Sequence, residues 1–147
     1  MIASGSFKAK ELVSKIVYSV WGENSLMFFR PETLRDLDLI RVRWGSGITI
    51  NDWSTGGQYS ESGLRSNMDS LVKDKNVLYL SGHCLAIAFD LKPVNGKINE
   101  FHDFLWKLMV TGQLKVFKRL EDRKKTPTWG HVDGLQTHDN KPEEFTL

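Results

Sequence analysis

Two histidines and one aspartate in the chain have the types and the order of a metal-ligand set. His83 and Asp90 lie in the segment 81–90, and His131 follows in the segment 129–133. Two imidazoles and one carboxylate suit zinc, and three protein ligands leave a fourth position open for water. An open position is typical of a catalytic zinc ion and not of a structural one. We therefore predict one Zn²⁺ held by these three side chains, and hydrolysis as its chemistry.

The spacing of the first two ligands demands a break in the chain between them. His83 and Asp90 are seven residues apart, and an extended chain would separate them by roughly 20 Å or more. Period-two alternation also places them on opposite faces of a regular strand. The chain must therefore fold back near Gly82 to Ala86, with His83 on a loop and Asp90 on the strand that follows.

Each ligand also has an ordinary structural interpretation. His83 fits a surface loop, and His131 fits a histidine on a half-buried strand. Asp90 fits the end of a strand or the cap of a turn, although it directly follows the apolar run 86–89. A carboxylate at such a position tends to be buried, and burial of a charge is costly unless it is paired or bound to a metal.

Hydrophobic spacing predicts the elements that must position these side chains. Helices are predicted over 7–21, 31–44 and 97–111, with a short helix over 67–75. Strands are predicted over 47–51, 77–80, 86–91, 114–120 and 128–133. A loop is predicted over 54–66, and a loose tail over 136–147. Because helices and strands are segregated, we predict an α+β fold in one domain over 1–147, with a small antiparallel sheet that carries the zinc site and packs against about three helices.

Composition excludes several classes of protein. The 147 residues, 40% of them hydrophobic and 26% charged, are typical of one soluble domain. A net charge of +2 is too small to indicate a nucleic-acid partner. A single cysteine rules out a disulfide within the chain, and no apolar run approaches the roughly 18 residues of a membrane span. No secretory signal is visible over 1–6, so we expect synthesis in the cytoplasm. We also expect a monomer.

The motifs resemble those of the zinc D,D-carboxypeptidase and L-alanyl-D-glutamate endopeptidase family. That family includes phage endolysins and vancomycin-resistance carboxypeptidases, and Hedgehog proteins share its fold. Its pattern is Ser-x-His-x-x-Gly-x-Ala-x-Asp, followed downstream by Trp-x-His. The matching positions here are Ser81, His83, Ala88, Asp90, Trp129 and His131. The upstream segment 50–65 is similar to the part of the family that precedes the first motif, so the resemblance spans roughly residues 47–134.

The chain departs from the family at two positions. Ala86 stands where the family has glycine, so we expect ordinary backbone angles in the turn after His83. Thr128 stands where many members carry an acidic residue, three positions before the last histidine. The resemblance therefore leaves the general base open.

The resemblance implies hydrolysis of peptide bonds in peptidoglycan, for which a carboxylate must move a proton from water to the leaving amine. The candidates are Glu121, Asp122 and Asp133. We favour Glu121, because in a hairpin where it lies opposite Trp129 its side chain shares a face with the last histidine. A register one residue different would turn it away, and a solvated charge is its alternative.

The resemblance also implies substrate-binding residues. Arg65 is the candidate for a substrate carboxylate, because guanidinium binds carboxylate in a planar fork. Ser81 is expected to form hydrogen bonds near the metal, to a ligand or to the substrate. A surface arginine and a turn serine are the alternatives. His102, on the third predicted helix, is expected at the surface.

Two functions follow as hypotheses. The first is a zinc peptidase of phage type that binds the stem peptide of peptidoglycan and acts on the bacterial cell wall. The second is a non-catalytic, zinc-containing binding or virion-structural module of the same fold, which the threonine at position 128 favours.

Overall fold

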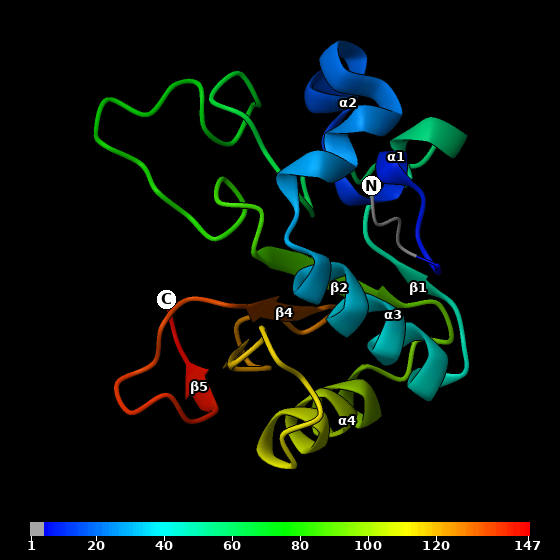
Figure 1. Ribbon diagram of the computed structural model, residues 1–147, viewed down its shortest axis with the longest axis vertical. Coiled ribbons are helices and arrows are strands. Elements are labelled where there is room, and N and C mark those ends of the chain that lie inside the picture. Colours follow the sequence, from blue (N-terminus) through cyan, green and yellow to red (C-terminus); the bar gives the residue numbers. More distant parts are fainter. Residues whose placement is uncertain (1–4) are drawn as a thin grey trace.

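A mixed β-sheet forms the frame of the computed structural model, which describes residues 5–147 (Figure 1). Its strands are β1 (Ile48–Thr49), β2 (Ala88–Pro93), β3 (Arg119–Glu121), β4 (Gly130–Asp133) and β5 (Glu143–Phe145). Within the described residues their order is β1-β2-β4-β3-β5. The first four strands pair antiparallel, and β5 pairs parallel with β3. The α+β class is confirmed, but the prediction of a purely antiparallel sheet is wrong.

The register of the sheet separates the hydrophobic core from the candidate ligands. Asp90 on β2 pairs with His131 on β4, and the next pair along the same strands is Phe89 with Val132. Because side chains alternate along a strand, the first pair lies on one face and the second on the other. Phe89 and Val132 are fully buried in the core, which leaves the opposite face for the ligands.

Two long helices begin and end where the sequence predicts. The helix α3 (Pro31–Trp44) has proline at its first turn and ends at Gly45, which adopts the left-handed conformation with φ 70°. The helix α4 (Ile98–Val110) lies within one residue of its predicted bounds and packs against β4 and β2. Both contribute apolar side chains to the core.

The first predicted helix, over 7–21, is two helices. They are α1 (Ala9–Leu12) and α2 (Lys15–Trp21), and the 3₁₀ helix η1 (Gly22–Phe28) follows them. Between α1 and α2 the backbone forms a bridge to Leu64, which donates to Leu12 O and accepts from Ser14 N, both at 2.9 Å. Ser14 then caps α2 by accepting a hydrogen bond from Val17 N. The apolar spacing continues across the break, so hydrophobic periodicity alone could not reveal it.

The fourth predicted strand, over 114–120, is β-structure only from Arg119 onward. Asp36 on α3 is buried, and its carboxylate accepts hydrogen bonds from the backbone N–H groups of Lys115, Val116 and Phe117 at 2.7–3.2 Å. These donors are therefore satisfied by a side chain and not by a neighbouring strand.

Three further predictions are wrong. Residues 67–75 form turns in place of a helix, and 77–80 are not a strand. The tail over 136–147 is not loose throughout, because it contains β5. The 3₁₀ helix η2 (Trp53–Thr55) begins the segment predicted as a loop.

Within residues 5–147, no helix combines the length and the apolar character that crossing a bilayer requires. The absence of a secretory signal was predicted over 1–6, and residues 1–4 of that segment lie outside the described residues.

Candidate metal centre

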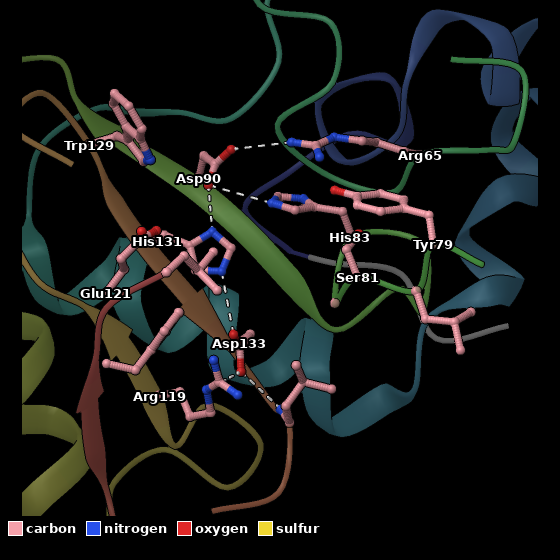
Figure 2. A pocket seen from close by; sticks show the side chains of 15 residues that line it. Arg65, Tyr79, Ser81, His83, Asp90, Arg119, Glu121, Trp129, His131 and Asp133 are labelled. Atoms are coloured by element: carbon pink, nitrogen blue, oxygen red, sulfur yellow. Dashed lines mark hydrogen bonds and ion pairs between the residues drawn. The ribbon is translucent and has the colours of Figure 1, made fainter. Parts of the chain in front are cut away.

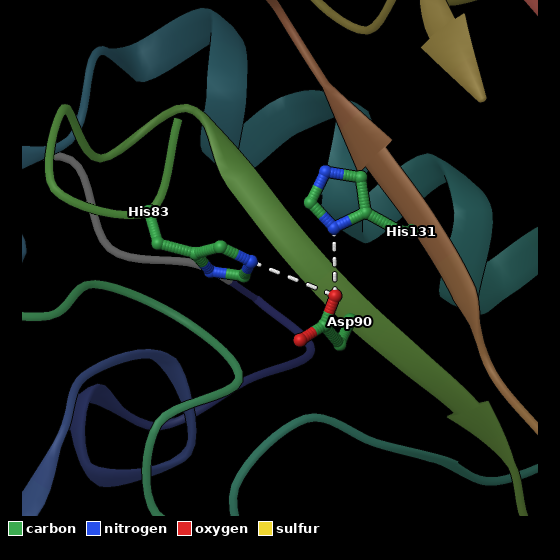
Figure 3. Close-up of side chains that lie close together, drawn as sticks. All are labelled: His83, Asp90 and His131. Atoms are coloured by element: carbon green, nitrogen blue, oxygen red, sulfur yellow. Dashed lines mark hydrogen bonds and ion pairs between the residues drawn. The ribbon is translucent and has the colours of Figure 1, made fainter. Parts of the chain in front are cut away.

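The three predicted ligands converge on one point of the sheet (Figure 3). Asp90 Oδ1 lies 2.8 Å from His131 Nδ1 and 3.5 Å from His83 Nε2. One donor atom from each of the three residues lies within 4.8 Å of the other two. Their side chains are 5–17% exposed, and the carboxylate of Asp90 is the most accessible. This cluster could hold a metal ion.

A tight turn brings His83 back to Asp90. The turn is closed by hydrogen bonds from Ile87 N to Gly82 O at 3.0 Å and from Ala86 N to His83 O at 3.3 Å. Gly82 has no room for a side chain, because a Cβ there would lie 2.7 Å from the Cβ of Ala88. The predicted fold-back of the chain is confirmed.

The backbone of this turn corrects one prediction. Ala86 has φ 59°, in the left-handed region that glycine adopts without cost. The expectation of ordinary backbone angles at this position is therefore wrong. The turn keeps the conformation for which glycine is suited although an alanine occupies it.

Each histidine has a partner on the ring nitrogen that points away from the cluster. His83 Nδ1 lies 2.9 Å from Gly63 O, so a proton on Nδ1 is donated to this carbonyl and Nε2 is left as a ligand atom. His131 Nε2 lies 3.4 Å from Asp133 Oδ2, which leaves Nδ1 as a ligand atom. Metal-binding histidines usually donate their second N–H to a carbonyl or carboxylate in this way. The surroundings thus select the tautomers that metal binding needs.

The charges of the cluster are strongly coupled. Burial alone would raise the pKa of Asp90, but hydrogen bonds with His131 and His83 outweigh burial and hold the pKa well below its usual range. Burial alone would lower the pKa of His131, but hydrogen bonds with Asp133 and Asp90 outweigh it and raise the pKa to about 9. In the absence of metal, a proton on His131 therefore places one positive charge between the carboxylates of Asp90 and Asp133.

The donor atoms would have to move to hold a small ion, because one pair is 2.8 Å apart while the three atoms together span up to 4.8 Å. Two imidazole nitrogens bound to a tetrahedral ion at about 2.0–2.1 Å are separated by roughly 3.3 Å. Asp90 Oδ1 and His131 Nδ1 are 2.8 Å apart, as expected for a shared proton. Replacement of that proton by an ion requires the two atoms to separate by only about 0.5 Å.

The cluster forms part of a cleft of about 370 Å³ (Figure 2). The cleft is lined by side chains from β2, β3, β4, β5 and the segment 79–83. The lining residues are Arg65, Tyr79, Leu80, Ser81, Gly82, His83, Asp90, Arg119, Glu121, Trp129, His131, Asp133, Leu135, Phe145 and Leu147. A volume of this size lies within the range of small-molecule and peptide sites.

The three candidate bases occupy different positions. Glu121 lines the cleft, and the β3–β4 register places it opposite His131. The predicted partner was Trp129, two residues away, but a shift of two residues keeps Glu121 on the same face of the sheet as His131, as predicted. Among the described residues its carboxylate has no hydrogen-bond partner. Asp133 also lines the cleft, but its carboxylate accepts a hydrogen bond from Leu135 N at 3.0 Å and faces the side chains of Arg119 and His131. Asp122 does not line the cleft, and its carboxylate accepts from Lys124 N in the next turn.

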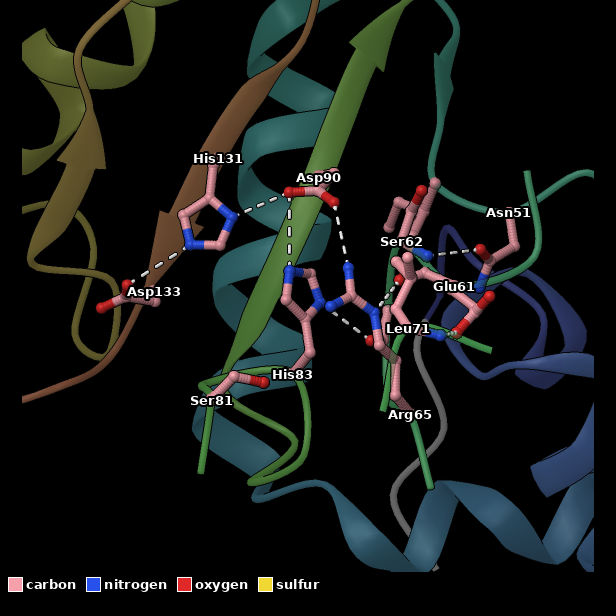
Figure 4. A network of polar contacts seen from close by, with 12 residues as sticks. Asn51, Glu61, Ser62, Arg65, Leu71, Ser81, His83, Asp90, His131 and Asp133 are labelled. Atoms are coloured by element: carbon pink, nitrogen blue, oxygen red, sulfur yellow. Dashed lines mark hydrogen bonds and ion pairs between the residues drawn. The ribbon is translucent and has the colours of Figure 1, made fainter. Parts of the chain in front are cut away.

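The two predicted substrate-binding residues lie at the cleft (Figure 4). A terminal nitrogen of Arg65 is 3.7 Å from Asp90 Oδ2, and its Nε donates to Glu61 O. Ser81 Oγ accepts from Cys84 N at 3.4 Å, so this serine caps the turn that carries His83. In the structure both side chains support the ligands as well as line the cleft.

Several residues of the site were missed by sequence reasoning. Arg119 and Phe145 line the cleft, the second from the segment predicted as a tail. Lys92 Nζ donates to Asp90 O, Ile50 O and Ser62 Oγ, and thereby fixes the strand beside the ligand. The alternation of β3 and β2 could have indicated Arg119 and Lys92, but nothing local marks Phe145.

His102 corrects another prediction. It lies on α4 and is fully buried, whereas the sequence placed it at the surface. Its Nε2 is 3.0 Å from Trp129 O, just before β4. This histidine therefore anchors the strand that carries His131, from the core side of the sheet.

Comparison of the chain with protein-family models, with curated proteins and with solved structures finds no match.

Proposed function

We propose that the protein is a zinc-dependent peptidase that hydrolyses peptide bonds of bacterial peptidoglycan, as a carboxypeptidase or an endopeptidase. The observation that carries the proposal is the convergence of His83, Asp90 and His131 in a cleft. The carboxylate of Glu121 lines the same cleft and has no partner within residues 5–147. The order of these residues along the chain is similar to that of the zinc carboxypeptidase and endopeptidase family. A phage enzyme that acts on the cell wall is the setting that this similarity favours.

The donor set supports zinc over the harder divalent ions. Two imidazoles and one carboxylate are common zinc ligands, whereas magnesium and calcium prefer oxygen ligands alone. Zinc bound there would supply a Lewis acid that polarises the scissile carbonyl and acidifies a water molecule.

Glu121 is the proposed general base and acid. Its carboxylate lies on the same sheet face as His131 and has no competing donor among the described residues. In this role Glu121 takes a proton from the attacking water and delivers it to the leaving amine. Asp133 is less suited, because its two oxygens already face Arg119, His131 and a backbone N–H. It is proposed to orient His131.

Arg65 and Ser81 are proposed to bind the substrate. Arg65 lines the cleft beside Asp90, and its side chain is 10% exposed. A guanidinium at this position would hold a substrate carboxylate and keep Asp90 ionised at the same time. Ser81 would offer its hydroxyl to the peptide next to His83.

A non-catalytic zinc-containing module, for binding or for a virion structure, is the second candidate. Its support is Thr128, which is exposed and stands where many members of the similar family carry an acid. In this alternative the ion stabilises the fold, and Glu121 has no catalytic role.

Mass spectrometry of muropeptides after incubation with purified peptidoglycan tests the proposal. We expect new fragments that identify one cleaved bond, and we expect a chelator to abolish them. The control is the His83→Ala variant, which should bind no metal and release nothing. One zinc ion per chain without cleavage of any wall type would favour the non-catalytic module. Absence of bound zinc would contradict both candidates.

A further inference from the structure

We propose that Arg119 forms a second anion-binding subsite of the cleft, on the opposite side of the metal cluster from Arg65. It follows, if the protein is the peptidase proposed above, that its substrate carries a carboxylate on each side of the bond that is cut. The ligand of the new subsite is a peptide carboxylate.

The guanidinium of Arg119 is held in a fixed position by two neighbours. Its Nε lies 3.3 Å from Asp133 Oδ1, and its central carbon lies 3.9 Å from the centroid of the Phe145 ring. An aromatic ring beneath a guanidinium attracts the cation and fixes its plane. The edge of this plane, with its N–H groups, is therefore positioned before a ligand arrives.

Strand β5 places Phe145 in this position. Asp122 N donates to Phe145 O, and Glu143 N donates to Lys118 O, both at 2.8 Å. The ring of Phe145 also makes an edge contact with the ring of His131, at 5.8 Å between centroids. The strand thus connects the arginine directly to a metal ligand, and its pairing with β3 gives Arg119 its platform.

Arg119 retains unused hydrogen-bond donors. A guanidinium has five N–H groups, of which one is on Nε and four are on the terminal nitrogens. Among the described residues, those terminal nitrogens donate no hydrogen bond. Arg119 nevertheless lines the cleft, and its side chain is 20% exposed. A bidentate carboxylate is the ligand that suits such an edge.

The contacts between the two arginines pass through the metal cluster. Arg65 faces Asp90, Asp90 faces His131, His131 faces Asp133, and Asp133 faces Arg119 (Figure 2). Both arginines line the same cleft. A peptide whose scissile carbonyl lies at the ion would therefore extend toward one arginine on each side.

The charge of the cleft also favours an anionic ligand. Of the described residues that line it, Arg65 and Arg119 are permanent cations, and Asp90, Glu121 and Asp133 are carboxylates. With a divalent ion bound and both histidines neutral, the positive charges exceed the negative ones by one. The loaded cleft is therefore cationic, which attracts an anionic peptide.

Calorimetric binding to zinc-loaded protein tests the inference. The probes are a stem-type peptide with two carboxylates, each of its two monoamides, and glutarate as a plain dicarboxylate. The Glu121→Gln background limits turnover, and each peptide is checked by mass spectrometry after the titration. In this background we expect the monoamide that lacks the carboxylate facing Arg119 to bind about tenfold to a hundredfold more weakly than the diacid, since a hydrogen bond to a charged group is lost.

Arg119→Gln is the decisive variant. We expect it to weaken binding of the diacid by the same factor. In this variant, amidation of the carboxylate that faces Arg119 should cause no further loss of affinity. Arg123→Gln is the matched control, because Arg123 does not line the cleft and pairs with Asp103 on the surface. Phe145→Leu keeps the charge but removes the platform, and should weaken diacid binding by a smaller factor. Zinc content and thermal unfolding are measured for every variant.

The outcomes separate this inference from the proposed function. Hydrolysis of peptidoglycan with no difference between Arg119→Gln and Arg123→Gln in diacid binding would overturn the subsite and leave the peptidase intact. Glutarate binding that requires Arg119, without hydrolysis of any wall, would support the subsite and contradict the peptidase. If neither the diacid nor glutarate loses affinity in Arg119→Gln, the subsite does not exist.

Discussion

Glu121 and Asp133 lie on one face of the sheet, but their carboxylates are not equally available for proton transfer. The oxygens of Asp133 are surrounded by Arg119, His131 and Leu135 N. Those of Glu121 face the cleft without a partner among the described residues. A carboxylate whose oxygens already face several donors has fewer lone pairs left for an attacking water molecule. Availability, more than proximity, therefore distinguishes the two.

We predict that Glu121→Gln lowers kcat of peptide hydrolysis by at least about 100-fold, in line with the loss of a general base. Zinc content should remain at one ion per chain, because Glu121 is not among the three ligands. Hydrolysis rates and metal analysis on the same preparation check both statements. The control is Asp122→Asn, which makes the same chemical change one residue away and outside the cleft. Full activity in Glu121→Gln would transfer the role to Asp133.

We also predict that zinc affinity rises with pH up to about 9. His131 must lose its proton to bind the ion, and its neighbours raise its pKa to about 9. Below that pKa, each pH unit should therefore change the apparent Kd about tenfold. Competition with a chromogenic chelator across this range measures the slope. An affinity that is flat between pH 6.5 and 9 would mean that His131 is already neutral in the metal-free protein.

At the residue scale the sequence contains the ligands but not their surroundings. His83, Asp90 and His131 can be predicted because residue type and order along the chain are local information. Gly63 O behind His83 and Phe145 beside His131 are contacts across the fold, at a separation of 20 residues in the first case. No local pattern encodes such contacts.

At the scale of elements, the turn before β2 is where the sequence and the backbone disagree most. Ala86 adopts φ 59° and is buried. The turn must take this conformation because it has to reverse the chain between two ligands that are seven residues apart. Alanine at such an angle is strained by about 1–2 kcal/mol.

We predict a small effect for one substitution at this position and a large effect for another. Ala86→Gly should change the free energy of unfolding by less than about 1 kcal/mol, because relief of strain is offset by the greater entropy of the unfolded chain. Ala86→Val should destabilise by more than about 2 kcal/mol and weaken zinc binding, since a β-branched residue fits a positive φ poorly. Chemical denaturation with and without zinc measures both. Equal stability of the valine and glycine variants would contradict the left-handed turn.

Other elements differ in how far local signals determine them. The helix α3 has proline at its start and a left-handed glycine after its end, so its bounds can be read from the sequence. The segment before β3 cannot be predicted in this way, because Asp36, almost 80 residues away, accepts its backbone hydrogen bonds. The same holds for β5, which is short and charged and is a strand because β3 offers it a free edge.

At the scale of the whole molecule, the pairing of strands in the sheet brings the residues of the site together. The sheet brings β2, β3, β4 and β5 together with the turn at His83, and one face of it carries the ligands while the other packs on the core. The ligands therefore lie next to a hydrophobic core that does not include them. Metal binding should add to stability and not be required for folding, unlike in small zinc domains.

Stability of the protein should depend on both pH and metal through the charges of this cluster. In the metal-free protein, the raised pKa of His131 contributes stability that is complete below its ordinary value of 6.5 and is lost as the pH rises toward 9. The lowered pKa of Asp90 contributes stability that is present above its ordinary value of 3.8 and is lost as the pH falls. Metal-free stability from this cluster should therefore be greatest between these two values.

Zinc should reverse the loss of stability between pH 6.5 and pH 9, because the ion replaces the proton that His131 loses. At a free zinc concentration 100 times the Kd, the ion adds about 2.7 kcal/mol, or a rise in Tm of about 5–10 °C for a chain of this size. Calorimetric scans at pH 6 and pH 8, at one fixed free zinc concentration, should show the larger rise at pH 8. His83→Ala should show no rise at either pH, whereas Arg123→Gln should match the unmodified protein. An equal rise in His83→Ala would mean that zinc binds elsewhere and that the cluster is only a network of ion pairs.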